Sequence, residues 1–191
     1  MQIHELLDRL ELISPNNTFF TDLRKTILNN DQFALFRLLQ QQTSSQLVEG
    51  LRKYKDNTEF NADCFSRGQL ESKLWLVKEL QKTKVDLGTV FLCAGWYATL
   101  ATMLFESSIT VDKIRSFDID DTCRAIAETF NKPWVKDNWK FKSSTKDIMD
   151  INYEFERYEV IRADGTTCPL DDTPDTIINT SCEHIENFEE W

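Results

Sequence analysis

The sequence predicts an α/β protein, with a Rossmann-like, mostly parallel sheet flanked by helices and an α-helical N-terminal extension. Two observations lead to this fold class. Short apolar segments rich in β-branched residues recur after Val85, separated by segments of helical spacing, whereas residues before about Leu80 show helical spacing alone. Strands that alternate with helices of about ten to fifteen residues are joined by parallel crossovers, so we expect helices on both faces of the sheet.

The N-terminal part is expected to be helical because its apolar residues recur every three or four positions. The segments with this spacing are Ile3–Ile13, Phe20–Ile27, Phe33–Leu39 and Leu47–Tyr54. A polar connector, Asn57–Asp63, follows them. We therefore expect a helical region over residues 1–60 and a Rossmann-like core over residues 61–191.

The core begins with a helix through Leu80, which Ser66 is placed to cap. Four segments then read as strands, the first of them apolar and bounded by Gly88 and Gly95. The expected strands are Thr89–Ala94, Ile114–Ile119, Trp139–Lys142 and Asp175–Thr180. Before the last of them, Tyr153–Ile161 alternates like a strand and leads into the turn Ala163–Gly165, which predicts a hairpin at the rim of the sheet.

Composition narrows the class of protein. The 191 residues include 22 Lys and Arg against 32 Asp and Glu, a formal net charge of −10, which does not favour a uniformly basic nucleic-acid surface but leaves a local basic groove open. Five cysteines without C-x-x-C spacing indicate neither a disulfide framework nor a zinc site. No apolar run approaches the roughly 20 residues that span a bilayer. We expect a soluble, cytoplasmic protein with no membrane contact.

Ligands of such sheets bind beyond the carboxyl ends of the strands, where the direction of the chain reverses. The first strand leads into a turn with small residues at Ala94, Gly95 and Ala98, followed by a helix. Small residues let the backbone approach a ligand, and a helix N-terminus offers free N–H groups to a negative group. Packing between the strand and the helix would account for the same residues.

Acidic residues follow the next two strands. Asp118 comes just over twenty residues after the glycine turn, a spacing at which a carboxylate accepts both hydroxyls of a ribose. Asp121 fits better as the N-cap of the next helix, and a solvated acidic turn is the alternative for the whole segment. After the third strand, Asp147 and Ile148 combine an acid for an adenine amino group with an apolar cover for one ring face.

With these strand ends the chain resembles the class I S-adenosylmethionine-dependent methyltransferases. More closely, several stretches are similar to methyltransferase-like proteins of tailed phages and their environmental relatives, which would place the protein in the host cytoplasm. Those stretches are FSRGQLESK (Phe65–Lys73), CAGWYATL (Cys93–Leu100), RSFDID (Arg115–Asp120), DNWKFK (Asp137–Lys142) and INTSCEHI (Ile178–Ile185). The likeness covers the chain from about Asn61 to its end.

The resemblance implies S-adenosylmethionine as cofactor and a role for each matching position. It puts Asp118 on the ribose and Asp147 with Ile148 at the adenine. The cofactor turn would comprise Cys93, Ala94, Gly95 and Trp96, and the acceptor would lie beside Asn179 and Ser181, with Glu183 or His184 as the base. Arg67 either binds the carboxylate of the methionine part or is a surface arginine in a capping turn.

The chain also departs from the family. The turn lacks a full Gly-x-Gly pattern, and the fourth strand lacks the Asn/Asp-Pro-Pro-aromatic sequence that serves exocyclic amino groups of bases. Only a short tail follows Thr180, so the C-terminal strands of the full fold are expected to be missing and the sheet edge open. Either a second copy or another chain covers the edge, or the protein is a shortened relative of the family. The alternative function is a non-catalytic binding or assembly protein, and a nicotinamide-dependent oxidoreductase is a distant third. The methyl acceptor stays unidentified.

Overall fold

The computed structural model of the chain describes residues 18–29, 45–54, 60–185 and 187–191. The chain divides into two compact units, Met1–Val48 and Glu49–Trp191. Two of the predicted N-terminal helices are present, as α2 (Thr18–Leu28) and α4 (Gln46–Tyr54). The predictions for Ile3–Ile13 and Phe33–Leu39 lie outside the described residues.

A four-stranded parallel sheet forms the centre of the second unit. Its strands are β1 (Thr89–Cys93), β2 (Lys113–Asp118), β3 (Phe141–Thr145) and β6 (Thr176–Asn179). Their order is β3-β2-β1-β6, and all neighbours are parallel. The predicted Rossmann-like arrangement is confirmed at this level. Within the described part of the chain, β6 pairs with β1 alone, and the prediction that another chain covers its outer edge stays a prediction.

The third strand begins later than the sequence predicted. We expected Trp139–Lys142, but β3 starts at Phe141 because Asn138 and Trp139 adopt left-handed φ angles of 49° and 54°. Such angles are incompatible with extended backbone. The two residues instead form the tight turn that leads into the strand.

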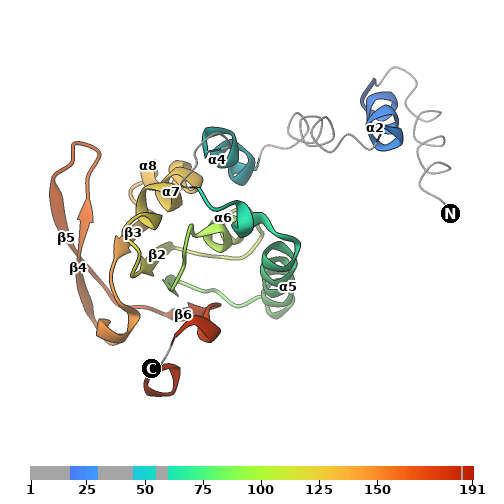
Figure 1. Cartoon of the computed structure of the whole chain (residues 1–191). Helices are drawn as coiled ribbons and strands as arrows, with labels where there is room; N and C mark the ends of the chain where they lie inside the picture. The colour runs from blue at the N-terminus through green and yellow to red at the C-terminus, as the bar shows by residue number, and fades with distance from the viewer. Residues whose placement is uncertain (1–17, 30–44, 55–59, 186) are drawn as a thin grey trace. The chain divides into compact units, whose positions relative to one another are not determined.

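The helices of the core follow the predicted order. One short and one long helix directly precede β1, one helix connects β1 to β2, and two connect β2 to β3 (Figure 1). They are η1 (Ala62–Phe65), α5 (Arg67–Thr83), α6 (Thr99–Phe105), α7 (Cys123–Phe130) and α8 (Lys132–Lys136). Ser66 does occupy the N-cap of α5, although its side chain forms no capping hydrogen bond.

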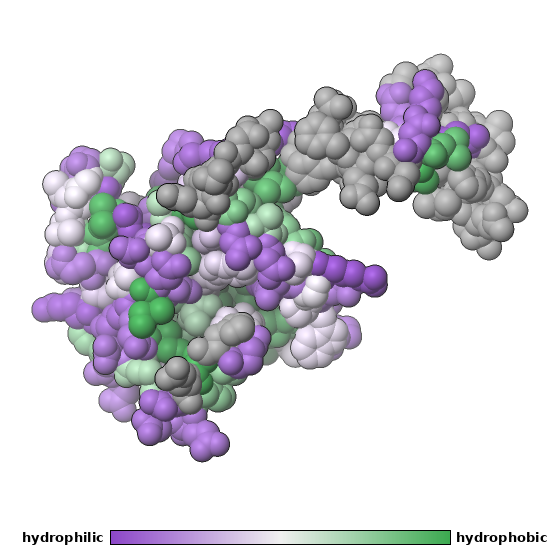
Figure 2. Space-filling model, in the orientation of Figure 1, coloured by the Kyte–Doolittle hydropathy of each residue, from purple (hydrophilic) through white to green (hydrophobic). Residues whose placement is uncertain are grey.

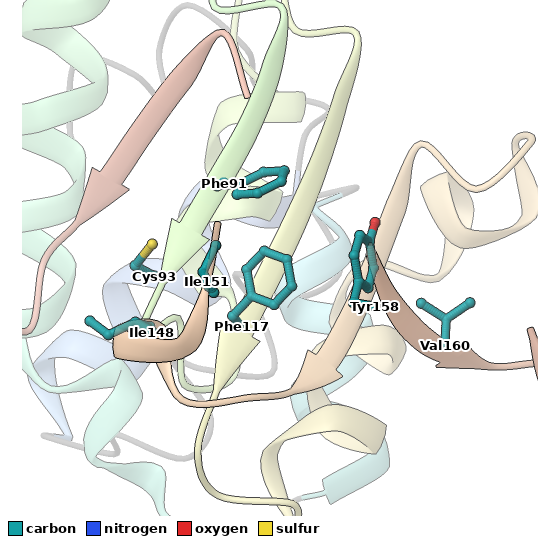
Figure 3. Packing of buried hydrophobic residues seen from close by; sticks show 7 residues of the cluster. All are labelled: Phe91, Cys93, Phe117, Ile148, Ile151, Tyr158 and Val160. Atoms are coloured by element: carbon teal, nitrogen blue, oxygen red, sulfur yellow. The ribbon is translucent and has the colours of Figure 1, made fainter. Parts of the chain in front are cut away.

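A hairpin rather than a helix packs on one face of the sheet. β4 (Glu156–Ile161) and β5 (Thr167–Asp172) pair antiparallel in a sheet of their own. The Tyr158 ring meets Phe117 edge-on at a centroid distance of 5.2 Å, and Val160 is buried in the same cluster (Figure 3). The predicted hairpin is thus present, but it forms a sheet of its own and packs on a face of the parallel sheet, not at the rim where it was expected. The expectation of helices on both faces is not met here, because the apolar alternation of β4 supplies the covering surface instead.

The face of the molecule drawn in Figure 2 is mostly polar. Figure 2 shows hydrophilic residues over most of the visible face, with hydrophobic residues in small patches between them. None of the described helices combines the length and the apolar character that crossing a membrane requires.

Candidate functional site

A cavity of about 610 Å³ lies where the carboxyl ends of the four parallel strands meet. In the observed order, β1 lies between β2 on one side and β6 on the other, so the strand order reverses at β1. This is the position at which open α/β sheets bind ligands. The strand ends contribute Ala94, Gly95, Trp96, Asp118, Ile119, Asp147, Ile148, Met149, Thr180, Ser181 and Glu183.

The turn after β1 has an unusual backbone. Ala94, Trp96 and Ala98 all have left-handed φ angles, of 49°, 50° and 50°. Residues other than glycine are strained at such φ angles, and strain of this kind is concentrated at functional sites. Ala94, Trp96 and Ala98 thus hold backbone conformations that glycine would adopt without strain.

Gly95 is required by space rather than by its own dihedral angles. A Cβ atom at this position would lie 2.2 Å from Ser116 Oγ and 3.1 Å from Leu92 Cγ. The turn therefore lies directly on β1 and β2. Its backbone N–H also donates to the carbonyl of Phe117 at 3.0 Å, which fixes the backbone at the cavity wall.

Asp118 joins the ends of two strands. One carboxylate oxygen accepts a hydrogen bond from Trp96 N at 2.7 Å, and the other accepts from Asp120 N at 3.1 Å. The side chain is half-buried and lines the cavity, as expected from its position in the sequence. Asp121 is not the N-cap of α7: that position is Thr122, whose N–H and hydroxyl donate to Asp120 and lower the pKa of that carboxyl.

The end of β3 supplies an acid and apolar side chains. Asp147 is half-buried and accepts from Met149 N at 3.0 Å, at the start of η2 (Ile148–Asp150). Ile119, which follows β2, is 70 % exposed at the same cavity. Ile119 therefore adds exposed apolar area beside the acid at the cavity wall.

At the end of β6, some of the predicted residues line the cavity and others do not. Ser181 and Glu183 line the cavity, and the Ser181 hydroxyl donates to the carbonyl of Ala94 at 3.2 Å. Asn179 does not line it, and instead accepts from Ser181 N at 2.9 Å, so it supports the turn from behind. The side chain of His184 is outside the described atoms.

Two further predicted residues are absent from the cavity wall. Cys93 is fully buried, with its Sγ atom 3.5 Å from Tyr153 Oη, and burial raises the pKa of its thiol to about 11. It points into the core because the alternation of β1 puts it on the same face as Phe91. Arg67 is exposed over 88 % of its side chain and pairs with Glu71 at 2.7 Å. It is therefore a surface arginine, which was the alternative to binding the cofactor.

The cavity includes residues that sequence reasoning missed. The cation at the wall is Lys73, from the middle of α5, together with Gln69 one turn before it. Their spacing of four residues in FSRGQLESK was the available signal, because residues four apart share a helix face. The other missed lining residues are Asp63, Thr99, Ile119, Met149, Ile185 and Asn187.

No protein-family model, no curated protein and no solved structure matches the chain. The chemistry is therefore argued from the cavity. Its charged lining consists of the carboxylates of Asp63, Asp118, Asp147 and Glu183 and the ammonium of Lys73. Among the described residues no His, Cys, Asp and Glu side chains are grouped in threes as a metal site. The wall therefore offers acceptors for hydroxyl and amino groups, apolar cover, and a single cation among the described lining residues.

Proposed function

We propose that the protein is a class I methyltransferase that binds S-adenosylmethionine in this cavity. One observation carries the proposal: the strained turn after β1, the acid after β2 and the acid with an apolar neighbour after β3 all line one cavity at the switch point of the sheet. In an adenosyl group, the two sugar hydroxyls would meet the acid after β2, and the flat base with its amino group would meet the acid and the apolar neighbour after β3. This convergence at one cavity is what supports the proposal.

Asp118 retains the capacity to hold a ribose. Each carboxylate oxygen has two acceptor positions, and one on each oxygen is taken by the backbone N–H of Trp96 or Asp120. The second position on each oxygen is left for a ribose hydroxyl. The backbone donors hold the carboxylate in place before the ligand arrives, which lowers the cost of binding.

The adenine would lie between the ends of β2 and β3. Ile119 covers one ring face and Ile148 with Met149 the other, while Asp147 accepts from the amino group. Asp147 is already fixed by its hydrogen bond from Met149 N. Exposed apolar area at Ile119 and Met149 is removed from water when a ring is bound.

The acceptor would approach from the end of β6. Bound S-adenosylmethionine supplies an electrophilic methyl group on a sulfonium, and the protein must align the acceptor with it. Ser181, fixed to the carbonyl of Ala94, orients the acceptor, and the carboxylate of Glu183 accepts the proton that the acceptor loses. The same cavity would serve a non-catalytic binding protein if no methyl group moves.

Calorimetry with S-adenosylmethionine and S-adenosylhomocysteine tests the proposal. We expect both to bind the unmodified chain, and Asp118→Asn to weaken each at least about tenfold, since hydrogen bonds to a charged group are lost. Asp121→Asn is the matched control: it removes the same charge three residues away, outside the cavity wall, and should leave both affinities unchanged. Absence of heat with either ligand would reject the proposal. Binding without methyl transfer to any acceptor would favour the non-catalytic alternative.

A further inference from the structure

The buried cations of the described chain differ in how their charge is compensated. Lys73, Arg115 and Lys142 are the buried lysines and arginines. Arg115 Nε lies 2.8 Å from Asp172 Oδ2, and Lys142 Nζ lies 2.7 Å from Glu128 Oε1. Lys73 forms no ion pair with any described carboxylate, and its Nζ donates only to the side-chain and backbone oxygens of Gln69.

This arrangement leaves a desolvated charge at the cavity. Lys73 is 9 % exposed, and removing an ammonium from water without a counter-ion is costly. Burial accordingly lowers the pKa of the Lys73 ammonium, an effect that the nearby Cys64 and Asp63 oppose. Two of its three N–H donors go to Gln69, so one is left for a ligand.

We infer that Lys73 binds the carboxylate of the amino-acid part of the bound cofactor, with Gln69 as the residue that positions it. The inference rests on the proposed function. Residues after β2 and β3 would hold the adenosine, so the amino-acid part must extend over the end of β1 and the Gly95 turn. Lys73 and Gln69 line the cavity from α5, which packs against α6, the helix that follows this turn. A ligand carboxylate at this place would give Lys73 the ion-pair partner that it lacks among the described residues.

The test compares two ligands that differ only in the amino-acid part. S-adenosylhomocysteine carries it, whereas 5′-methylthioadenosine has the same adenosine and thioether without it. Calorimetry on the full chain should show that Lys73→Met weakens S-adenosylhomocysteine at least about tenfold and leaves methylthioadenosine within about twofold. Arg67→Met, which removes an exposed cation from the same helix, should change neither affinity, and Lys73→Arg should restore part of the loss.

A second readout needs no ligand. Because Lys73 is buried without a carboxylate, Lys73→Met should leave the melting temperature of the free protein unchanged or higher, while it abolishes the extra stabilisation that S-adenosylhomocysteine gives over methylthioadenosine. Equal losses for both ligands, or full retention of S-adenosylhomocysteine affinity, would overturn the inference. If neither ligand binds the unmodified chain, the proposed function fails as well. If both bind and Lys73→Met does not distinguish them, only the role of Lys73 is rejected.

Discussion

The carboxylate of Asp118, at the end of β2, accepts a hydrogen bond of 2.7 Å from the backbone N–H of Trp96 in the turn after β1. Trp96 has a left-handed φ of 50°, so the bond holds a strained turn in place. Asp118 therefore serves the protein before any ligand is present. The structural role and the proposed ribose-binding role can be separated by the choice of substitution.

Asp118→Ala should destabilise the free protein more than Asp118→Asn. Alanine leaves the half-buried N–H group of Trp96 without its partner, at a cost of about 1–3 kcal/mol, and it also removes the acceptor of the exposed Asp120 N–H group. Asparagine keeps one oxygen acceptor and should lose about 1 kcal/mol or less. Urea denaturation of the two variants measures the difference. Equal stabilities would contradict the anchoring role.

Gly95→Ala should destabilise the protein by about 1–3 kcal/mol through overpacking against Ser116. Ser116→Ala alone should be neutral or slightly stabilising, since the buried hydroxyl has no hydrogen-bond partner among the described residues. The double variant should recover stability, with a coupling of about 1 kcal/mol in a double-mutant cycle. Strict additivity of the two substitutions would show that the turn does not lie on Ser116.

The ion pairs that join Asp172 of the hairpin to Lys113 and Arg115 of β2 should weaken in acid. Burial of Asp172 raises its pKa, but hydrogen bonds from Lys113, Tyr158 and Arg115 outweigh this effect and leave the pKa below its ordinary value. The ionised carboxylate thus stabilises the folded protein at pH values above the ordinary pKa of an aspartate. This contribution is lost as the pH falls through the lower pKa of the folded state. The free energy of unfolding should fall below about pH 4.

Asp172→Asn tests this assignment. The variant should be less stable than the unmodified chain by about 3–5 kcal/mol at pH 7, because Arg115 loses its carboxylate partner at 2.8 Å while it stays buried. Its stability should also depend less on pH in the acid range. Urea titrations at a series of pH values give both quantities. A variant with the same acid slope as the unmodified chain would exclude Asp172 as the group responsible.

The thiols should fall into two classes of reactivity. Burial raises the pKa of Cys64, Cys93 and Cys123 to about 12, 11 and 12, and the thiolate is the reactive form. Cys168 and Cys182 are only half-buried. Ellman's reagent at pH 8 should therefore titrate Cys168 and Cys182 quickly and the other thiols only on unfolding. A Cys168→Ser/Cys182→Ser variant should lose the fast phase, and rapid reaction of Cys93 would contradict its place in the core.

The sequence predicted the parallel sheet because β1 is a short apolar run that is buried along its whole length, and further strand-like segments alternate with helices after it. It placed Asp118 and Asp147 correctly at the cavity because strand ends share one edge of a parallel sheet. It missed the start of β3: Asn138 is a residue type that tolerates left-handed backbone, but Trp139 carries no local sign of it.

Side-chain direction was the other limit. Arg67 and Lys73 lie on one helix, and only the packing of α5 decides which of them faces the cavity. Cys93 and Ala94 are adjacent, and the end of β1 between them sends one side chain into the core and the other to the cavity. Such choices depend on tertiary contacts between α5, β1 and the residues after β6, which no single segment encodes.

A crystal structure of the chain with S-adenosylhomocysteine tests the central claim most directly. The account predicts the ligand over the carboxyl ends of β1 and β2, with both ribose hydroxyls within hydrogen-bond distance of the Asp118 carboxylate. A ligand bound elsewhere, or a cavity that stays empty at saturating concentration, would contradict it.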